Sequence, residues 1–96
     1  MRSARGVLTK EVKKLSKVLM GYEINKVELR LMPYLQYVVM NSAEMANINK
    51  EEYDVLRDWR DKGWVSGTLS DFKISEDFWG IINKILWLSY VNKMND

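Results

Sequence analysis

The sequence predicts an all-α fold, a small domain of four helices with one short extended or hairpin segment between the third and the fourth. Three observations predict it. Apolar residues recur at helical spacing along most of the chain, polar capping residues precede three of these stretches, and residues 64–74 break the helical period. With 96 residues, one Pro and no Cys, we expect a single domain over residues 9–96, preceded by a flexible basic arm over residues 1–8.

The first helix is expected to follow Thr9, which can cap it, and to end near Met20 at Gly21. Residues 1–17 hold six basic residues against Glu11 alone, a formal charge of +5, which leaves −3 for the rest of the chain. The six are the candidates for nucleic-acid contact: Arg2, Arg5, Lys10, Lys13, Lys14 and Lys17. A solvated helix face is the plainer interpretation, because runs of charge usually are that.

A second helix is expected from about Lys26 to Asn41, with a broad apolar stripe. Pro33 lies inside this stretch, so it either kinks the helix or starts a new helix at its first turn. The Met32–Pro33 bond offers a cis/trans choice, and a trans bond is the ordinary case. Residues 42–48 then form a short connection.

The third helix has complete boundary signals. Asn49 can cap it, Glu52 completes a capping box, and Gly63 ends it. Trp64, directly after that glycine, can fold back onto Trp59 as such C-caps require.

Residues 64–74 contain turn-forming pairs at 66–67 and 70–71, and Phe72 and Ile74 alternate with Lys73. This pattern predicts a short hairpin or an extended loop before the last helix.

The last helix follows Ser75, its expected N-cap, and contains the most apolar stretch of the chain, residues 78–91. Ten of these fourteen residues are apolar or aromatic. One stripe of the helix is expected in the core: Phe78, Ile82, Ile85 and Leu86. A helix that is apolar on most sides is normally buried on most sides, and a chain this short offers little else to cover it. We therefore expect a protein-binding surface, with these candidates: Trp64, Trp87, Leu88 and Val91.

An enzyme is not predicted. The chain has no His or Cys to act as base or nucleophile, and no Gly-rich phosphate-binding loop follows a strand. The acidic residues at 51–61 have basic neighbours at pairing distance, which favours surface ion pairs over a metal site. We therefore expect neither a cofactor nor a metal. No signal peptide or membrane span is expected, and the lack of Cys suits a reducing compartment such as the cytoplasm.

Two alternatives to a protein-binding function stay open, a DNA-binding regulator and a homodimer. A small DNA-binding regulator of winged-helix type would use residues 49–62 as its recognition helix and residues 66–71 as its wing. The charges oppose this hypothesis, because that helix carries two Glu and three Asp, so we expect at most weak, non-specific binding of nucleic acid. A homodimer that buries the last helix against itself is the other alternative.

Three stretches together resemble a known group of proteins: ELRLMPYLQYVVMN at 28–41, EEYDVLRDWRDKGWVSG at 51–67 and EDFWGIINKILWLSYV at 76–91. They are similar to small accessory proteins of temperate bacteriophages, and among these to the phage anti-RecBCD family, whose members are helical and of about this size. The resemblance covers most of residues 28–91 and does not include the basic start.

The resemblance implies a non-enzymatic inhibitor or modulator that acts in the cytoplasm of the bacterial host. Such a protein binds the RecBCD helicase–nuclease, in particular its RecC subunit, protects phage DNA ends and redirects recombination. The family is also associated with a host prolyl isomerase, and this association adds Pro33, the single proline of this chain, as a fifth candidate for partner binding.

Overall fold

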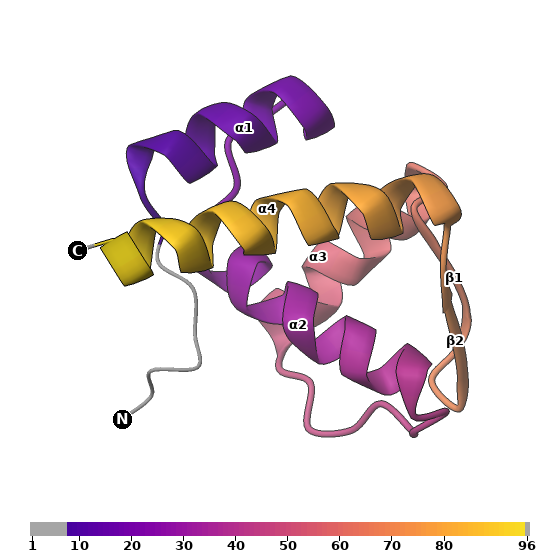
Figure 1. Ribbon diagram of the computed structural model, residues 1–96. Helices are drawn as coiled ribbons and strands as arrows, with labels where there is room; N and C mark the ends of the chain where they lie inside the picture. The colour runs from indigo at the N-terminus through magenta and orange to yellow at the C-terminus, as the bar shows by residue number, and fades with distance from the viewer. Residues whose placement is uncertain (1–7, 96) are drawn as a thin grey trace.

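The computed structural model (Figure 1) describes residues 8–95 of the protein, the last six of them through the backbone alone. Its elements are α1 (Lys10–Met20), α2 (Lys26–Met40), α3 (Lys50–Asp61), β1 (Val65–Thr68), β2 (Asp71–Ile74) and α4 (Glu76–Asn95). This order confirms the predicted fold class, four helices with a short antiparallel hairpin between the third and the fourth. Of the predicted arm, only Leu8 lies within the described residues, where it packs half-buried against the core.

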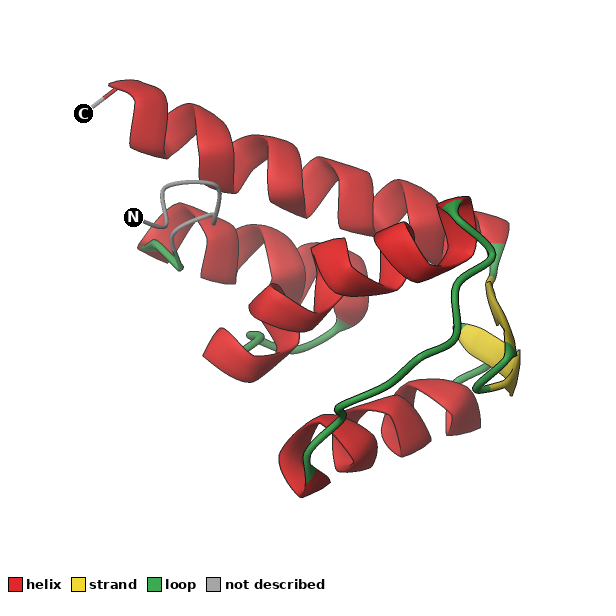
Figure 2. Cartoon of the chain, turned by 90° about the horizontal axis from the view of Figure 1, so that it is seen from below, coloured by secondary structure: helices red, strands yellow, loops and turns green. Residues whose placement is uncertain are grey.

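The other elements pack around α4. In Figure 1, α1 lies on one side of α4, and α2 and α3 lie on the other. Figure 2, seen from below, shows that α1 and α4 run in opposite directions, with the start of α1 and the end of α4 at the same end of the molecule. All four helices contribute large, fully buried side chains: Val12, Leu31, Met32, Leu35, Val38, Trp59, Phe78, Ile82 and Ile85.

Each helix begins at a polar cap. The predicted caps are confirmed: Thr9 Oγ1 accepts from the amide of Val12, and Ser75 Oγ accepts from the amide of Phe78. Asn49 forms the predicted capping box. A second capping box, between Asn25 and Glu28, starts α2. These side chains satisfy backbone donors that the first turn of a helix leaves unpaired.

Pro33 lies inside α2, which runs through it as one helix. The alternative that Pro33 starts a new helix is therefore wrong. The ring is exposed, and because proline has no amide hydrogen, the carbonyl of Leu29 one turn earlier accepts no hydrogen bond from residue 33. The peptide bonds of the described residues are all trans, including the one that precedes Pro33.

The structure confirms the hairpin alternative for residues 64–74, but the turn includes one residue of the second predicted turn-forming pair and none of the first. Val65 pairs with Ile74 and Thr68 with Asp71, so the turn consists of residues 69 and 70. The pair at 66–67 belongs to β1, although its composition suggested a turn. Gly67 has a φ of 88°, and a Cβ on it would lie 2.1 Å from the carbonyl oxygen of Asp71. Glycine is required there by backbone approach within the strand pair.

Residues 43–49 connect α2 to α3 without a helical turn or a strand, and Asn47 within them has a positive φ of 60°. The amide of Met45 donates to the carbonyl of Leu69 at the hairpin tip over 2.8 Å. The Tyr34 hydroxyl donates to the carbonyl of Ala46 over 2.9 Å and accepts from its amide over 3.1 Å. These bonds hold the connection against both α2 and the hairpin.

Candidate protein-binding surface

The two faces of α4 differ sharply in exposure. Phe78, Ile82, Ile85 and Leu86 are buried, which confirms the predicted core stripe. Trp87 lies on the opposite face and is 67% exposed. Leu88 lies between these faces and is half-buried. The structure therefore leaves a large aromatic side chain in solvent, as the apolar excess of this helix predicted.

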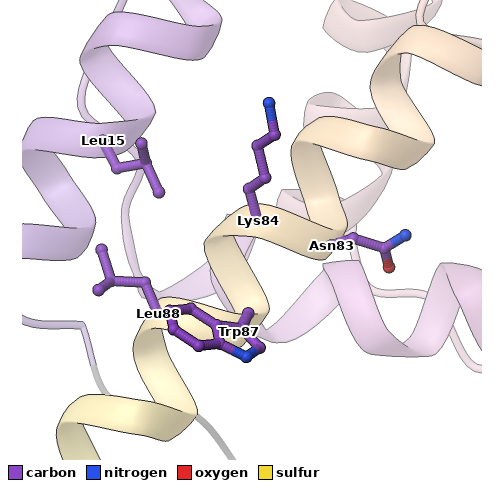
Figure 3. A pocket seen from close by; sticks show the side chains of 5 residues that line it. All are labelled: Leu15, Asn83, Lys84, Trp87 and Leu88. Carbon is purple, nitrogen blue, oxygen red and sulfur yellow. The ribbon is translucent and has the colours of Figure 1, made fainter.

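A shallow groove lies beside Trp87, between α1 and α4 (Figure 3). It has a volume of about 530 Å³, and its lining comes from Leu15 on α1 and from Asn83, Lys84, Trp87 and Leu88 on α4. Figure 3 shows Leu15 and Leu88 pointing toward each other across the gap, with the Trp87 ring beside Leu88 and Lys84 extending outward. The floor of the groove is therefore apolar and one of its edges is cationic.

Two polar contacts fix the helices that form the groove. Ser16, next to Leu15, is fully buried, and its hydroxyl accepts from the amide of Ile24 over 3.1 Å. This bond ties α1 to the segment that leads into α2. On α4, Asn83 Oδ1 accepts from Gln36 of α2 over 2.7 Å, so its amide points away from the groove. The groove is thus built by elements anchored to the rest of the domain.

The five residues predicted to bind a partner do not form one surface. Trp87 and Leu88 lie together in the groove. Trp64 is half-buried and stacks on Phe78, with ring centroids 4.9 Å apart and planes 9° from parallel, so most of its area packs against the core. Pro33 is exposed on α2, away from the groove. The side chain of Val91 lies outside the described residues.

The ring of Trp64 stacks on Phe78, whereas the sequence predicted that it folds back onto Trp59. The ring packs on Phe78, and it is the amide of Trp64 that reaches back, donating to the carbonyl of Trp59 over 2.9 Å. The Trp59 ring meets Phe78 edge-on, with centroids 4.9 Å apart. Phe78 is therefore held between two indoles at the start of α4.

The lysines of α1 are exposed, at positions 10, 13, 14 and 17. Three ion pairs form in the described part of the chain, at Lys50–Asp54, Lys62–Asp58 and Lys73–Asp71, and none involves α1 or Lys84. Arg2 and Arg5, the other candidates for nucleic-acid contact, lie outside the described residues. The cationic charge of α1 is therefore available to an external partner.

Neither Leu15 nor Lys84 is among the binding residues predicted from the sequence. Leu15 is only half-buried, because α1 turns one flank toward the groove. A usable signal existed for Lys84, which lies three and four residues before Trp87 and Leu88 and so shares a helix face with both.

A buried polar network lies elsewhere, between α2 and α3. The Tyr22 hydroxyl donates to Glu28 Oε2 over 2.6 Å and accepts from Trp59 Nε1 over 2.9 Å. Glu28 also accepts from the amide of Asn25. Burial, together with the hydrogen bond to Glu28, raises the pKa of Tyr22 well above its usual range. These hydrogen bonds link the segment before α2 to α2 and α3, so we assign the network a structural role.

The acidic residues of α3 do not gather into a metal site: no group of three or more His, Cys, Asp or Glu side chains among residues 8–89 could hold a metal ion. None of the helices, as far as they are described, has the length and hydropathy to span a membrane.

Comparison of the chain with protein-family models, with curated proteins and with solved structures found no match. The resemblance to phage anti-RecBCD proteins stays a hypothesis from the sequence. The class defined by the fold is a small, mostly α-helical domain with a hairpin, and the candidate site is an exposed apolar groove.

Proposed function

We propose that this chain is a non-enzymatic protein-binding module whose partner docks on the groove between α1 and α4. The observation that carries the proposal is the 67% exposure of Trp87 beside the apolar floor formed by Leu15 and Leu88. An indole held in solvent next to two leucines is a cost to an isolated monomer and a typical anchor of an interface.

The sequence resemblance narrows the proposal to a phage-type modulator of a host DNA-processing enzyme. In this form the partner is a RecBCD-like helicase–nuclease, contacted through its RecC subunit, and the outcome is protected phage DNA or redirected recombination in the host cytoplasm. A contact with a host prolyl isomerase belongs to the same proposal, and the exposure of Pro33 on α2 leaves it accessible to one.

The test is direct binding of the purified chain to purified RecBCD, together with inhibition of its exonuclease on linear duplex DNA. Trp87→Ala should weaken both by at least tenfold, since truncation of a central aromatic anchor often costs about 2 kcal/mol or more. The matched control is Tyr37→Ala, which removes an aromatic ring of 57% exposure from α2, outside the groove. Normal binding by the Trp87 variant would refute the site, and no binding by the wild type would refute this partner.

A winged-helix DNA-binding regulator is the second candidate, because the hairpin directly follows α3 and its tip is bonded to the extended chain before α3. The exposed acids of α3 argue against it: Glu51, Asp54, Asp58 and Asp61 would face the phosphate backbone. Binding to random and to selected duplexes should therefore be equally weak and should fade with salt. A preferred sequence bound tightly near physiological salt would favour this second candidate.

A homodimer is the remaining alternative for the exposed face of α4. Sedimentation equilibrium tests this alternative by comparing the molecular mass in solution of the wild type with that of Trp87→Ala. A dimer that dissociates in the variant would assign Trp87 to self-association.

A further inference from the structure

We propose that the segment which enters the groove is an acidic amphipathic helix of the partner, with apolar side chains on one face and Asp or Glu along its flanks. This inference rests on the proposed function and adds the chemistry of the bound segment. Its basis is the combination of an apolar floor with an edge formed by Lys84, beside a helix, α1, of net positive charge.

The shape of the groove suits a helix. It lies between α1 and α4, two helices that run in opposite directions (Figures 1 and 2) and that contribute all its lining residues. A third helix laid into such a groove presents apolar residues at i, i+3, i+4 and i+7 to the floor. Outside the lining residues, α1 carries a further exposed apolar side chain, that of Val18. It is 79% exposed and lies three residues after Leu15, on the neighbouring part of the same face.

The charges around the apolar floor indicate which residues the bound helix carries on its flanks. Lys84 lines the groove and shares a face of α4 with Trp87 and Leu88. On α1, Lys14 lies one turn before Val18, and the helix as a whole has a formal charge of +3, with Glu11 as its single acid. None of these lysines forms an ion pair within the described residues. A basic segment would be repelled by Lys84 and by the net positive charge of α1, in which four lysines outnumber Glu11, and carboxylates would be attracted by the same cations.

The same charges disfavour a second copy of this chain as the occupant. Two copies joined through their grooves would bring Lys84 and the lysines of α1 of one copy toward those of the other. Nucleic acid would satisfy the lysines, but its phosphates gain nothing from Leu15, Val18 and Leu88. The apolar floor therefore favours a protein helix over a polyanion.

The test uses defined peptides, because the charge pattern is the point at issue. The probe is a labelled 18-residue amphipathic helix with Leu and Phe on one face and Glu on both flanks. The control peptide has Lys in place of every Glu. We expect the full-length chain to bind the acidic peptide at least tenfold more tightly than the basic one, measured by fluorescence anisotropy at low and physiological salt.

Two variants locate the bound peptide. Trp87→Ala should weaken binding of the acidic peptide at least tenfold, and Lys84→Glu should weaken it while improving binding of the basic peptide. Tyr37→Ala should change neither. Circular dichroism of each variant confirms that the fold is retained.

The outcomes separate this inference from the proposed function. Equal affinity for both peptides, or an acidic peptide that binds independently of Lys84 and Trp87, would overturn the inference. Displacement of the acidic peptide by single-stranded DNA, with DNA binding that requires Trp87, would assign the groove to nucleic acid instead. If a protein partner binds through Trp87 while the acidic peptide does not bind, the inference fails and the proposed function stands. If the acidic peptide binds through Trp87 while RecBCD does not bind, the named partner fails and the inference stands.

Discussion

Truncation to alanine should lower the stability of the fold much more at one tryptophan of this chain than at another. Trp59 is fully buried and Trp87 is 67% exposed. A tryptophan buries up to about 250 Å² of area, so the third of Trp87 that is covered amounts to roughly 80 Å². At about 25 cal/mol per Å² this is worth at most ~2 kcal/mol, and alanine keeps part of it. Trp59→Ala should cost about 3–5 kcal/mol, because it also opens a cavity.

The Trp59 truncation also removes specific contacts, namely the edge-on packing against Phe78 and the hydrogen bond to Tyr22. For a domain of this size, 1 kcal/mol shifts the Tm by roughly 4–8 °C. Thermal unfolding followed by circular dichroism should therefore lower the Tm of Trp87→Ala by less than about 8 °C, at about 4 °C per kcal/mol, and urea unfolding should show a correspondingly small change. Trp59→Ala should lose 12 °C or more by the same conversion, about the minimum expected from a 3 kcal/mol cost, or should fail to fold. A Trp87 variant as destabilised as the Trp59 variant would refute the assignment of Trp87 to the surface.

Three further predictions follow from the local geometry. Gly67→Ala should destabilise the domain by about 1–3 kcal/mol, because the alanine would need a positive φ and its Cβ would clash with Asp71. Gly80→Ala in α4, where a Cβ meets nothing within 4 Å, should stabilise the domain by about 0.5–1 kcal/mol. Urea unfolding that ranked the two variants the other way would contradict the strand assignment of Gly67. The stability of the wild type should fall as pH rises above about 10, because the unfolded chain then releases the Tyr22 proton, whereas the raised pKa of Tyr22 in the folded chain retains it. When denaturation midpoints are measured against pH, Tyr22→Phe should show a shallower decline than the wild type. Equal slopes would mean that the Tyr22 phenol has the same pKa in the folded and unfolded states. Asn49→Ala should cost about 1 kcal/mol in urea unfolding by loss of the α3 cap, and unchanged stability would show the cap to be dispensable.

Local signals in the sequence were sufficient for the helix boundaries and for the two faces of α4. The side chain of Ser75 and the glycine at 63 act over three or four residues, so their roles can be derived without a fold. The exposure of Trp87 also followed from helical periodicity, because it lies opposite the stripe that contains Ile82 and Ile85.

Features that depend on distant contacts could not be derived in this way. The pair at 66–67 has the composition of a turn, and only its pairing with 72–73 makes it part of a strand. Trp64 looked like a surface anchor because its partner, Phe78, is fourteen residues away in the sequence. The groove likewise requires Leu15 and Leu88 to meet across two helices, which no local pattern predicts.

The lengths of the helices explain why the face of Trp87 remains uncovered. At about 1.5 Å per residue, the 20 residues of α4 span roughly 30 Å, whereas the 11 residues of α1 span roughly 16 Å. The main buried face of α1 already packs into the core through Val12, Ser16 and Met20. Only its flank, with Leu15, remains for the side of α4 that carries Trp87. The narrow apolar stripe of α1 cannot cover both the core face of α4 and the face that carries Trp87, so the second face stays exposed. The external helix that we propose would supply the apolar stripe that covers it.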